Sequence, residues 1–393
     1  MDSVLPMFAT LVGAFRRLIP QAVYGDGRRL EVLAWAVIGL CQTKTVNFIQ
    51  WAEVVLSQAT RASSHQRRFH RWLHNPHIRP AEFYPYLLQA ALADWDWVER
   101  LYVAVDVSDL HNGYILIRTA LIYRGRAIPV AWRVIAHPGT SIGYAEYEPV
   151  LQQTIQALPA TAQLVFLLDR GFVHQALFRF IRHQPRCQVR LRAKATTQVR
   201  LHDRRVVSMA QLCPPQGQVY CFAQVAVFGD GLIGPVYLAL AQPETPGEEP
   251  WYIISDQPTG LPTLDEYALR FDIEENFLDD KSNGFQAEAS RLDDAAAWER
   301  LFSILAVATL YFTSVGTGVV KLKFRRFVDS HWDRGMSYLK IGWSWLRQQY
   351  RRGWPSLPTF WLDPEPDPEP ALASRRQAAQ PKRTWVVSCF GAT

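Results

Sequence analysis

Four residues with charged or aromatic side chains recur at helical spacing late in the chain: Tyr267, Arg270, Glu274 and Lys281. At about 100° per residue, a continuous helix would bring these side chains within roughly 60° of one another. The sequence therefore predicts a narrow stripe that holds an aromatic ring, two cations and a carboxylate. Such a stripe suits a phosphodiester backbone and a divalent metal, although a solvated helix face with ion pairs has the same pattern.

The start of this helix is also predicted from the sequence. The segment Thr263-Leu264-Asp265-Glu266 has the form of a capping box, so Thr263 is the expected N-cap. Glu275 lies about 100° away from Glu274 on such a helix. Glu274 is therefore the carboxylate expected on the face that carries the cations.

Two aspartates upstream lie in strand-like surroundings. Asp106 falls inside the apolar, β-branched run 101–107, where a charge is costly unless it has a partner. Asp109 is a nearby alternative, predicted to lie in the turn after Ser108. Asp169 ends the apolar run 164–168. Either aspartate alone is more often a turn former or a helix cap than a metal ligand.

The pattern Tyr267-x2-Arg270-x3-Glu274-x6-Lys281 resembles the Y-R-E-K signature of insertion-sequence-four-type DDE transposases. The stretch Asp169-Arg-Gly-Phe resembles the second-aspartate motif of the same group. The resemblance implies an α/β fold: an RNase H-like mixed sheet with a β-rich insertion between the second Asp and the Glu, flanked by helical regions.

The resemblance also implies that Asp106, Asp169 and Glu274 form a catalytic triad. Mg²⁺ prefers oxygen ligands, and two such ions about 3.5 to 4 Å apart can activate the attacking oxygen and stabilise the leaving one. Asp106 is expected to bridge two Mg²⁺ ions, and Asp169 and Glu274 to hold one each. Mn²⁺ is a possible substitute for Mg²⁺.

For the DNA, the resemblance implies that Arg270 and Lys281 grip phosphates near the scissile bond and that Tyr267 contacts the same strand. Trp251 opens a predicted strand ahead of the glutamate helix. In relatives a tryptophan at this place stacks on a base that is flipped out while a DNA hairpin forms. A role as a core aromatic is the alternative for Trp251.

The charge of the chain favours a polyanionic partner. Among 393 residues the net charge is +6, and the sequence pI is about 9.1. Residues 54–81 contain no Asp or Glu, and Arg67, Arg68 and Arg71 are interleaved there with aromatic residues. This segment is predicted to contact a DNA backbone. Two further basic tracts, at 186–205 and 321–353, suggest a long duplex laid across the protein, although a charge run is usually a solvated face.

Five regions are expected along the chain. Residues 1–97 are predicted to be a helical DNA-binding region, 98–194 the first part of the RNase H-like core, 195–260 the β-rich insertion, 261–354 the second part of the core with C-terminal helices, and 355–393 a flexible tail.

The segment 301–320 carries no charge and is long enough to span a bilayer. Its serines, threonines and glycines dilute the apolar face, so a helix packed behind the sheet is predicted instead. No secretory signal is evident, and five cysteines without a CxxC pair indicate a reducing compartment. A cytoplasmic, nucleoid-associated protein without a membrane partner is expected.

The predicted function is that of a DNA transposase catalysing Mg-dependent strand cleavage and strand transfer of an insertion sequence. The expected partners are transposon ends and target DNA, with a homodimer in the DNA complex. The alternatives are an RNase H-like nuclease, a domesticated DNA-binding descendant without transposition activity, and a membrane protein with one span.

Overall fold

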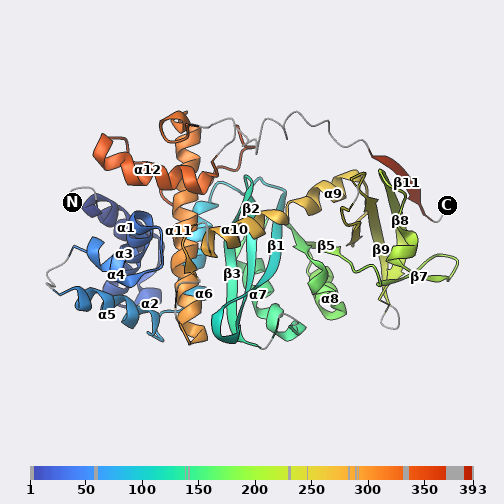
Figure 1. Ribbon diagram of the computed structural model, residues 1–393, viewed down its shortest axis with the longest axis horizontal. Helices are drawn as coiled ribbons and strands as arrows, with labels where there is room; N and C mark the ends of the chain where they lie inside the picture. The colour runs from blue at the N-terminus through green and yellow to red at the C-terminus, as the bar shows by residue number, and fades with distance from the viewer. Residues whose placement is uncertain are drawn as a thin grey trace.

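The computed structural model describes residues 4–56, 61–137, 139, 142–228, 232–245, 247–281, 284–287, 290, 292–330, 336–368 and 385–391. The molecule is elongated, with N-terminal helices at one end and antiparallel strands at the other (Figure 1). A single mixed sheet runs between the two ends.

Between residues 4 and 97, every described element of secondary structure is a helix, as predicted. Its helices are α1 (Val4–Leu18), α2 (Gln21–Tyr24), α3 (Gly27–Thr43), α4 (Phe48–Val54), α5 (Ala62–Leu73) and α6 (Pro80–Ala91). Asp26 caps α3, because its side chain accepts a hydrogen bond from the backbone N–H of Arg28. The apolar residues of these helices belong to the same core as the central sheet.

Five strands in the middle of the molecule (Figure 1) form one half of the sheet, in the spatial order β3-β2-β1-β4-β5, and are called the middle strands. Their bounds are β1 (Arg100–Asp109), β2 (Tyr114–Tyr123), β3 (Arg126–Ala136), β4 (Gln163–Leu168) and β5 (Cys187–Arg192). β1, β2 and β3 pair antiparallel, whereas β4 is parallel to both β1 and β5. Arg124 and Gly125 form the turn that joins β2 and β3 as a hairpin. Both residues have positive φ angles, as the two-residue turn of a tight hairpin requires.

The β-rich insertion continues this sheet and does not form a separate one. Its strands are β6 (Gln198–Arg200), β7 (Val206–Ser208), β8 (Gln218–Val227), β9 (Ile233–Gln242) and β10 (Trp251–Ser255). β10 pairs antiparallel with both β5 and β9, and so joins the insertion to the middle strands. With the C-terminal strand β11 (Val386–Phe390), the sheet has 11 strands.

Helices cover both faces of the middle strands. Thr119 of β2 contacts Thr154 of helix α7 (Tyr144–Ala157), with 2.5 Å between the hydroxyl oxygens. Its neighbour Arg118 contacts helix α10 (Phe271–Lys281). Because adjacent strand residues face opposite sides, α7 and α10 lie on opposite faces of the sheet. Helix α8 (Gln175–His183) follows β4 and packs against α7 and β5.

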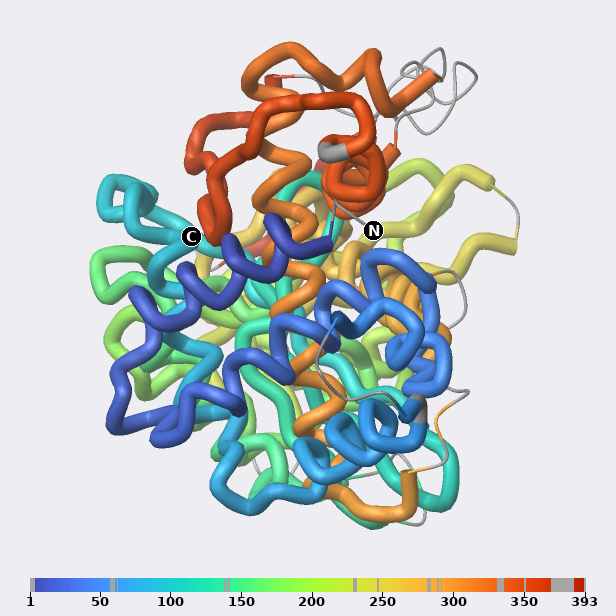
Figure 2. The backbone as a smooth tube through the Cα atoms, turned by 90° about the vertical axis from the view of Figure 1, so that its left-hand side faces the viewer, coloured from blue at the N-terminus to red at the C-terminus, as the bar shows by residue number. Residues whose placement is uncertain are grey.

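Helix α11 (Ala295–Lys321) runs through the centre of the molecule, between the N-terminal helices and β3 (Figures 1 and 2). It is long and apolar enough to cross a membrane, but its apolar stretch is completely buried in the protein. The prediction of a helix packed behind the sheet is confirmed. Gly316 of α11 and Gly342 of α12 (Tyr338–Arg352) let the two backbones meet, because a Cβ atom on either would collide with a carbonyl oxygen of the facing helix.

The prediction of a flexible tail from residue 355 is wrong for part of this segment. Phe360 and Leu362 are buried in the main core, and Trp95 donates its indole N–H to the carbonyl of Leu362. Residues 386–390 form β11, which pairs with β8. These few apolar residues are held by distant parts of the chain, so they show no local apolar periodicity. Residues 369–384 of the predicted tail lie outside the described residues.

Candidate active site

The predicted continuous helix is two helices in the structure. α9 spans Leu261–Ala268, and α10 begins at Phe271. At the junction, the N–H of Arg270 donates to the carbonyl of Tyr267 (3.0 Å), and the N–H of Ile273 to that of Arg270 (3.2 Å). These bonds span three residues and tighten the chain locally, so the geometry of one regular helix does not hold across the junction.

The predicted N-cap is also wrong. α9 begins two residues before Thr263, with Gly260 at the N-cap position. The Thr263 hydroxyl accepts a hydrogen bond from the backbone N–H of Gly260 (3.1 Å). The side chain of Thr263 thus acts from the third helical position, where the residue that completes a capping box stands.

Asp106 and Asp169 lie side by side at the sheet. In the parallel pair of β1 and β4, Val105 is opposite Leu168. Asp106 directly follows Val105 in the chain, and Asp169 directly follows Leu168. Asp106 is still within β1, and Asp169 directly follows β4. The two carboxylates thus occupy neighbouring positions where β4 ends beside the parallel strand β1, and strand ends are a common place for functional sites in α/β proteins.

The third carboxylate joins them through Arg270. Its guanidinium lies 3.4 Å from Oδ2 of Asp106 and 2.6 Å from Oε1 of Glu274. Arg270 is only 4 % exposed, and the negative charge of Asp169 also acts on it. Residues 106, 169 and 274, which are far apart in sequence, therefore surround one buried cation.

The electrostatics of Asp106 reflect this crowding. Burial raises the pKa of Asp106 to about 6, and the negative charges of Asp169 and Glu274 add to the effect. The positive charge of Arg270 and the hydrogen bond from the N–H of Val107 act in the opposite direction. The positive charge near Asp106 therefore does not fully compensate the cost of ionising its carboxyl group.

The carboxylate oxygens decide whether the site could hold a metal. Oδ1 of Asp169 is buried and has no hydrogen-bond donor, so it is an acceptor to which a cation could bind. Within the described part of the chain, however, no three acidic, histidine or cysteine side chains are already close enough to hold a metal ion together. Arg270 pairs with two of the three carboxylates, so metal binding would require these pairs to loosen.

A buried ion pair fixes α10 on the sheet beneath this site. Arg118, fully buried on β2 opposite Asp106, donates to Oδ1 of Asn276 (2.8 Å) and Oδ2 of Asp280 (2.5 Å). Asn276 and Asp280 are one helical turn apart, so they set the position of α10 along the strands. Sequence reasoning missed these residues; the signal was an arginine inside the apolar run 114–123.

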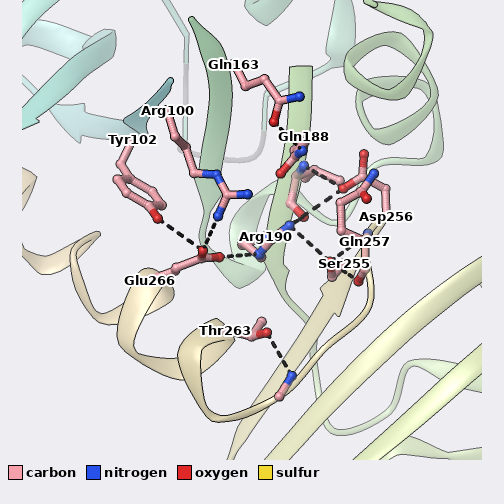
Figure 3. A network of polar contacts seen from close by, with 12 residues as sticks. Arg100, Tyr102, Gln163, Gln188, Arg190, Ser255, Asp256, Gln257, Thr263 and Glu266 are labelled. Atoms are coloured by element: carbon pink, nitrogen blue, oxygen red, sulfur yellow. Dashed lines mark hydrogen bonds and ion pairs between the residues drawn. The ribbon is translucent and has the colours of Figure 1, made fainter. Parts of the chain in front are cut away.

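A second network fixes α9. The carboxylate of Glu266 accepts hydrogen bonds from Arg100 (2.8 Å) and Tyr102 (3.1 Å) of β1 and from Arg190 (2.9 Å) of β5 (Figure 3). Arg190 also donates to Ser255 at the end of β10 (3.0 Å). Glu266 therefore ties the helix that precedes Arg270 to β1 and β5, and Arg190 extends the network to the end of β10.

The predicted DNA-contacting residues are not gathered at one place. Tyr267 is fully buried, 5.7 Å from the ring of Trp251, and so does not reach the surface to contact DNA. Trp251 is half-buried and lines an open cavity of about 530 Å³ together with Trp385 and residues of α9. Lys281 is the last residue of α10, and its side chain lies outside the described residues.

Part of the predicted basic segment forms α5, which lies at one end of the molecule, whereas β1 and α10 lie in the middle (Figure 1). Arg67 and Arg71 of α5 are exposed, and Arg68 is half-buried. Asp109, the alternative to Asp106, is the last residue of β1 and not part of the turn. It lines a different cavity, of about 250 Å³, beside Asp280.

Comparisons with known proteins give little beyond this geometry. No family model and no curated protein matches the chain. Among solved structures, the chain is similar to a piggyBac transposase synaptic complex with hairpin DNA, with a TM-score of 0.42 and 10 % sequence identity. The match covers 91 % of this chain and 86 % of that chain. A similarity at this level establishes neither a shared fold nor a function.

Proposed function

We propose that this protein is a DDE transposase of the insertion-sequence-four type, which cleaves DNA strands and joins them to a target. The observation that carries the proposal is the meeting of Asp106, Asp169 and Glu274 around Arg270. The strand order β3-β2-β1-β4-β5, with only β4 and β5 parallel to β1, supports an RNase H-like core. In such a core the first aspartate lies on the central strand, as Asp106 does.

Two Mg²⁺ ions, held by Asp106, Asp169 and Glu274, would polarise the attacking and leaving oxygens of an in-line phosphoryl displacement. The residues of the chain position the carboxylates and the phosphate. β1 and β4 hold the two aspartates at adjacent positions, and the Arg118–Asp280 pair keeps α10 over them. Arg270 supplies positive charge that a phosphate could share once its ion pairs loosen.

DNA is the proposed partner, both as transposon ends and as target. The exposed arginines of α5 would hold the duplex backbone away from the cleavage point. A homodimer in the DNA complex follows from the need to process two ends together. A cytoplasmic, nucleoid-associated location is part of the same proposal.

The triad is tested by charge removal at constant shape. Asp106→Asn, Asp169→Asn and Glu274→Gln are each expected to lower the rate of strand cleavage by at least about 10³-fold, with DNA affinity largely unchanged. The substrate is a duplex containing the DNA that flanks the gene, with Mg²⁺ or Mn²⁺. Asp109→Asn and Glu275→Gln are matched controls, because each changes a nearby carboxylate outside the triad.

The outcomes separate the alternatives. Normal cleavage by Glu274→Gln means that Glu274 is not a catalytic residue. Cleavage without joining of the ends to a target plasmid identifies a nuclease. Binding without cleavage by the unmodified protein identifies a domesticated descendant.

A further inference from the structure

The C-terminal strand β11 brings two cysteines together. β11 pairs parallel with β8, and Cys389 is the register partner of Cys221. Neighbouring strands lie about 4.8 Å apart, within the range of roughly 4.4 to 6.8 Å between Cα atoms that a disulfide can bridge. Paired residues point to the same face of a parallel ladder, so the two thiols face each other across the strands.

The surroundings of the pair agree with this orientation. Val219 and Cys221 belong to a small apolar cluster beneath α9, and Trp385, just before β11, packs on the same cluster. On the opposite face, Phe390 stacks on Phe222 with 4.9 Å between ring centroids. Each face of β11 therefore packs on a different group of β8 side chains. Cys389 lies on the same face as Cys221 and Trp385.

We propose that Cys221 and Cys389 are a redox-active thiol pair, which closes to a disulfide and fixes the C-terminal strand on β8. The remaining cysteines differ in their positions. Cys41 is buried in α3, Cys187 begins β5 opposite Leu164, and Cys213 donates to the side-chain oxygen of Gln242. None of these three has another cysteine at a paired position in the described strands.

The reaction needs an oxidant, for which a small disulfide such as glutathione disulfide suffices. The exposed Cys389 thiolate attacks one sulfur of the oxidant, forms a mixed disulfide and releases one thiolate. Cys221 then loses its proton to water and attacks the Cys389 sulfur, which releases the second thiolate. Two protein thiols are oxidised, and one oxidant disulfide is reduced to two thiols.

The order of attack follows from the two environments. Burial, with a smaller contribution from the neighbouring Cys389, raises the pKa of the Cys221 thiol to about 11. Little Cys221 thiolate is present at neutral pH, so Cys389 reacts first and closure of the ring is the slow step. Closure also holds Trp385 in the wall of the cavity that contains Trp251.

The experiment uses the full chain, reduced, desalted and then incubated with defined ratios of glutathione disulfide to glutathione. Intact mass and peptide mapping report the products. The parent protein is expected to lose two hydrogens and to yield a peptide that joins residues 221 and 389. Cys389→Ser is expected to form no such link. Cys221→Ser is expected to accumulate glutathione on Cys389, because the second attack cannot occur.

Cys213→Ser is the matched control and is expected to behave as the parent. Hydrogen exchange of residues 386–390 is expected to slow by about tenfold or more on oxidation. The proposal is overturned if the 221–389 link forms at no ratio, or if Cys389 of the parent retains glutathione as fully as in Cys221→Ser. It is equally overturned if the link forms but the exchange of β11 does not change.

Discussion

At the scale of single residues, Asp106 is predicted to make stability depend on pH. Its pKa in the folded protein is about 6, above the ordinary value of 3.8. Between these values the folded protein binds a proton more readily than the unfolded chain does, so the contribution of Asp106 to stability falls as the pH rises and is constant above about pH 6.

Asp106→Asn removes this dependence, because asparagine does not titrate. The stability of the variant relative to the parent is expected to increase between pH 4 and pH 6 by at most about 3 kcal/mol, since one pKa unit corresponds to 1.36 kcal/mol. Thermal or urea unfolding at a series of pH values, in the presence of a chelator, measures the difference. If the stability difference between variant and parent is the same at every pH, the pKa of Asp106 is not raised in the folded protein.

The sequence indicated candidate site residues where a charged side chain falls within or directly after an apolar strand. Asp106 inside an apolar strand is such a residue, and so is Asp169 at the end of one. The directions of the side chains on α9 relative to those on α10 were not predictable, because they depend on the break between the two helices. Tyr267, on α9, lies in the interior, where a surface position was expected.

At the scale of elements, the ion pair of Arg118 and Asp280 is predicted to control the position of α10. Arg118→Ala removes a fully buried cation from Asp280 and Asn276, and is expected to lower the free energy of unfolding by about 3 to 5 kcal/mol. Arg118→Met combined with Asp280→Leu replaces the pair by apolar side chains of similar size, and is expected to recover most of the loss.

Denaturant unfolding of the single and double variants forms the measurement. A single variant as stable as the parent contradicts a structural role for the pair. Arg133→Ala is a suitable control, because Arg133 lies on the neighbouring strand and pairs with Glu146 near the surface.

The strands β1, β2 and β3 could be predicted almost to the residue, since 98–136 consists of three β-rich runs with a turn signal at Arg124-Gly125. The break at Leu269-Arg270 could not, because neither proline nor glycine marks it. The ties of Glu266 to β1 and β5 and of Asp280 to β2 fix the two helices separately, and such contacts between distant segments leave no local pattern. For the same reason the sequence did not show that the insertion extends the main sheet.

At the scale of the whole molecule, the proposed DNA-binding helix α5 lies away from the proposed catalytic carboxylates. Arg67 and Arg71 are exposed, and no described acidic residue forms an ion pair with either. The double variant Arg67→Ala, Arg71→Ala is expected to weaken DNA binding roughly tenfold near 0.1 M salt and to reduce the salt slope by about 2.

Fluorescence anisotropy with a labelled duplex at several salt concentrations measures both quantities, and the thermal stability is expected to be unchanged. Arg133→Ala is the matched control, because Arg133 lies outside the three basic tracts and already pairs with Glu146. An unchanged salt slope in the double variant excludes α5 from the DNA interface.

β11 has one more consequence, for the behaviour of the chain in concentrated solution. β8 pairs with β9 along one side, whereas on its other side β6 covers only residues 226–227 and β11 covers 218–222. Without β11, the apolar run Val219-Tyr220-Cys221-Phe222 would present unsatisfied backbone groups at an open sheet margin, which is the form in which strands recruit other molecules into aggregates. β11 thus covers the edge of β8 that is most prone to aggregation.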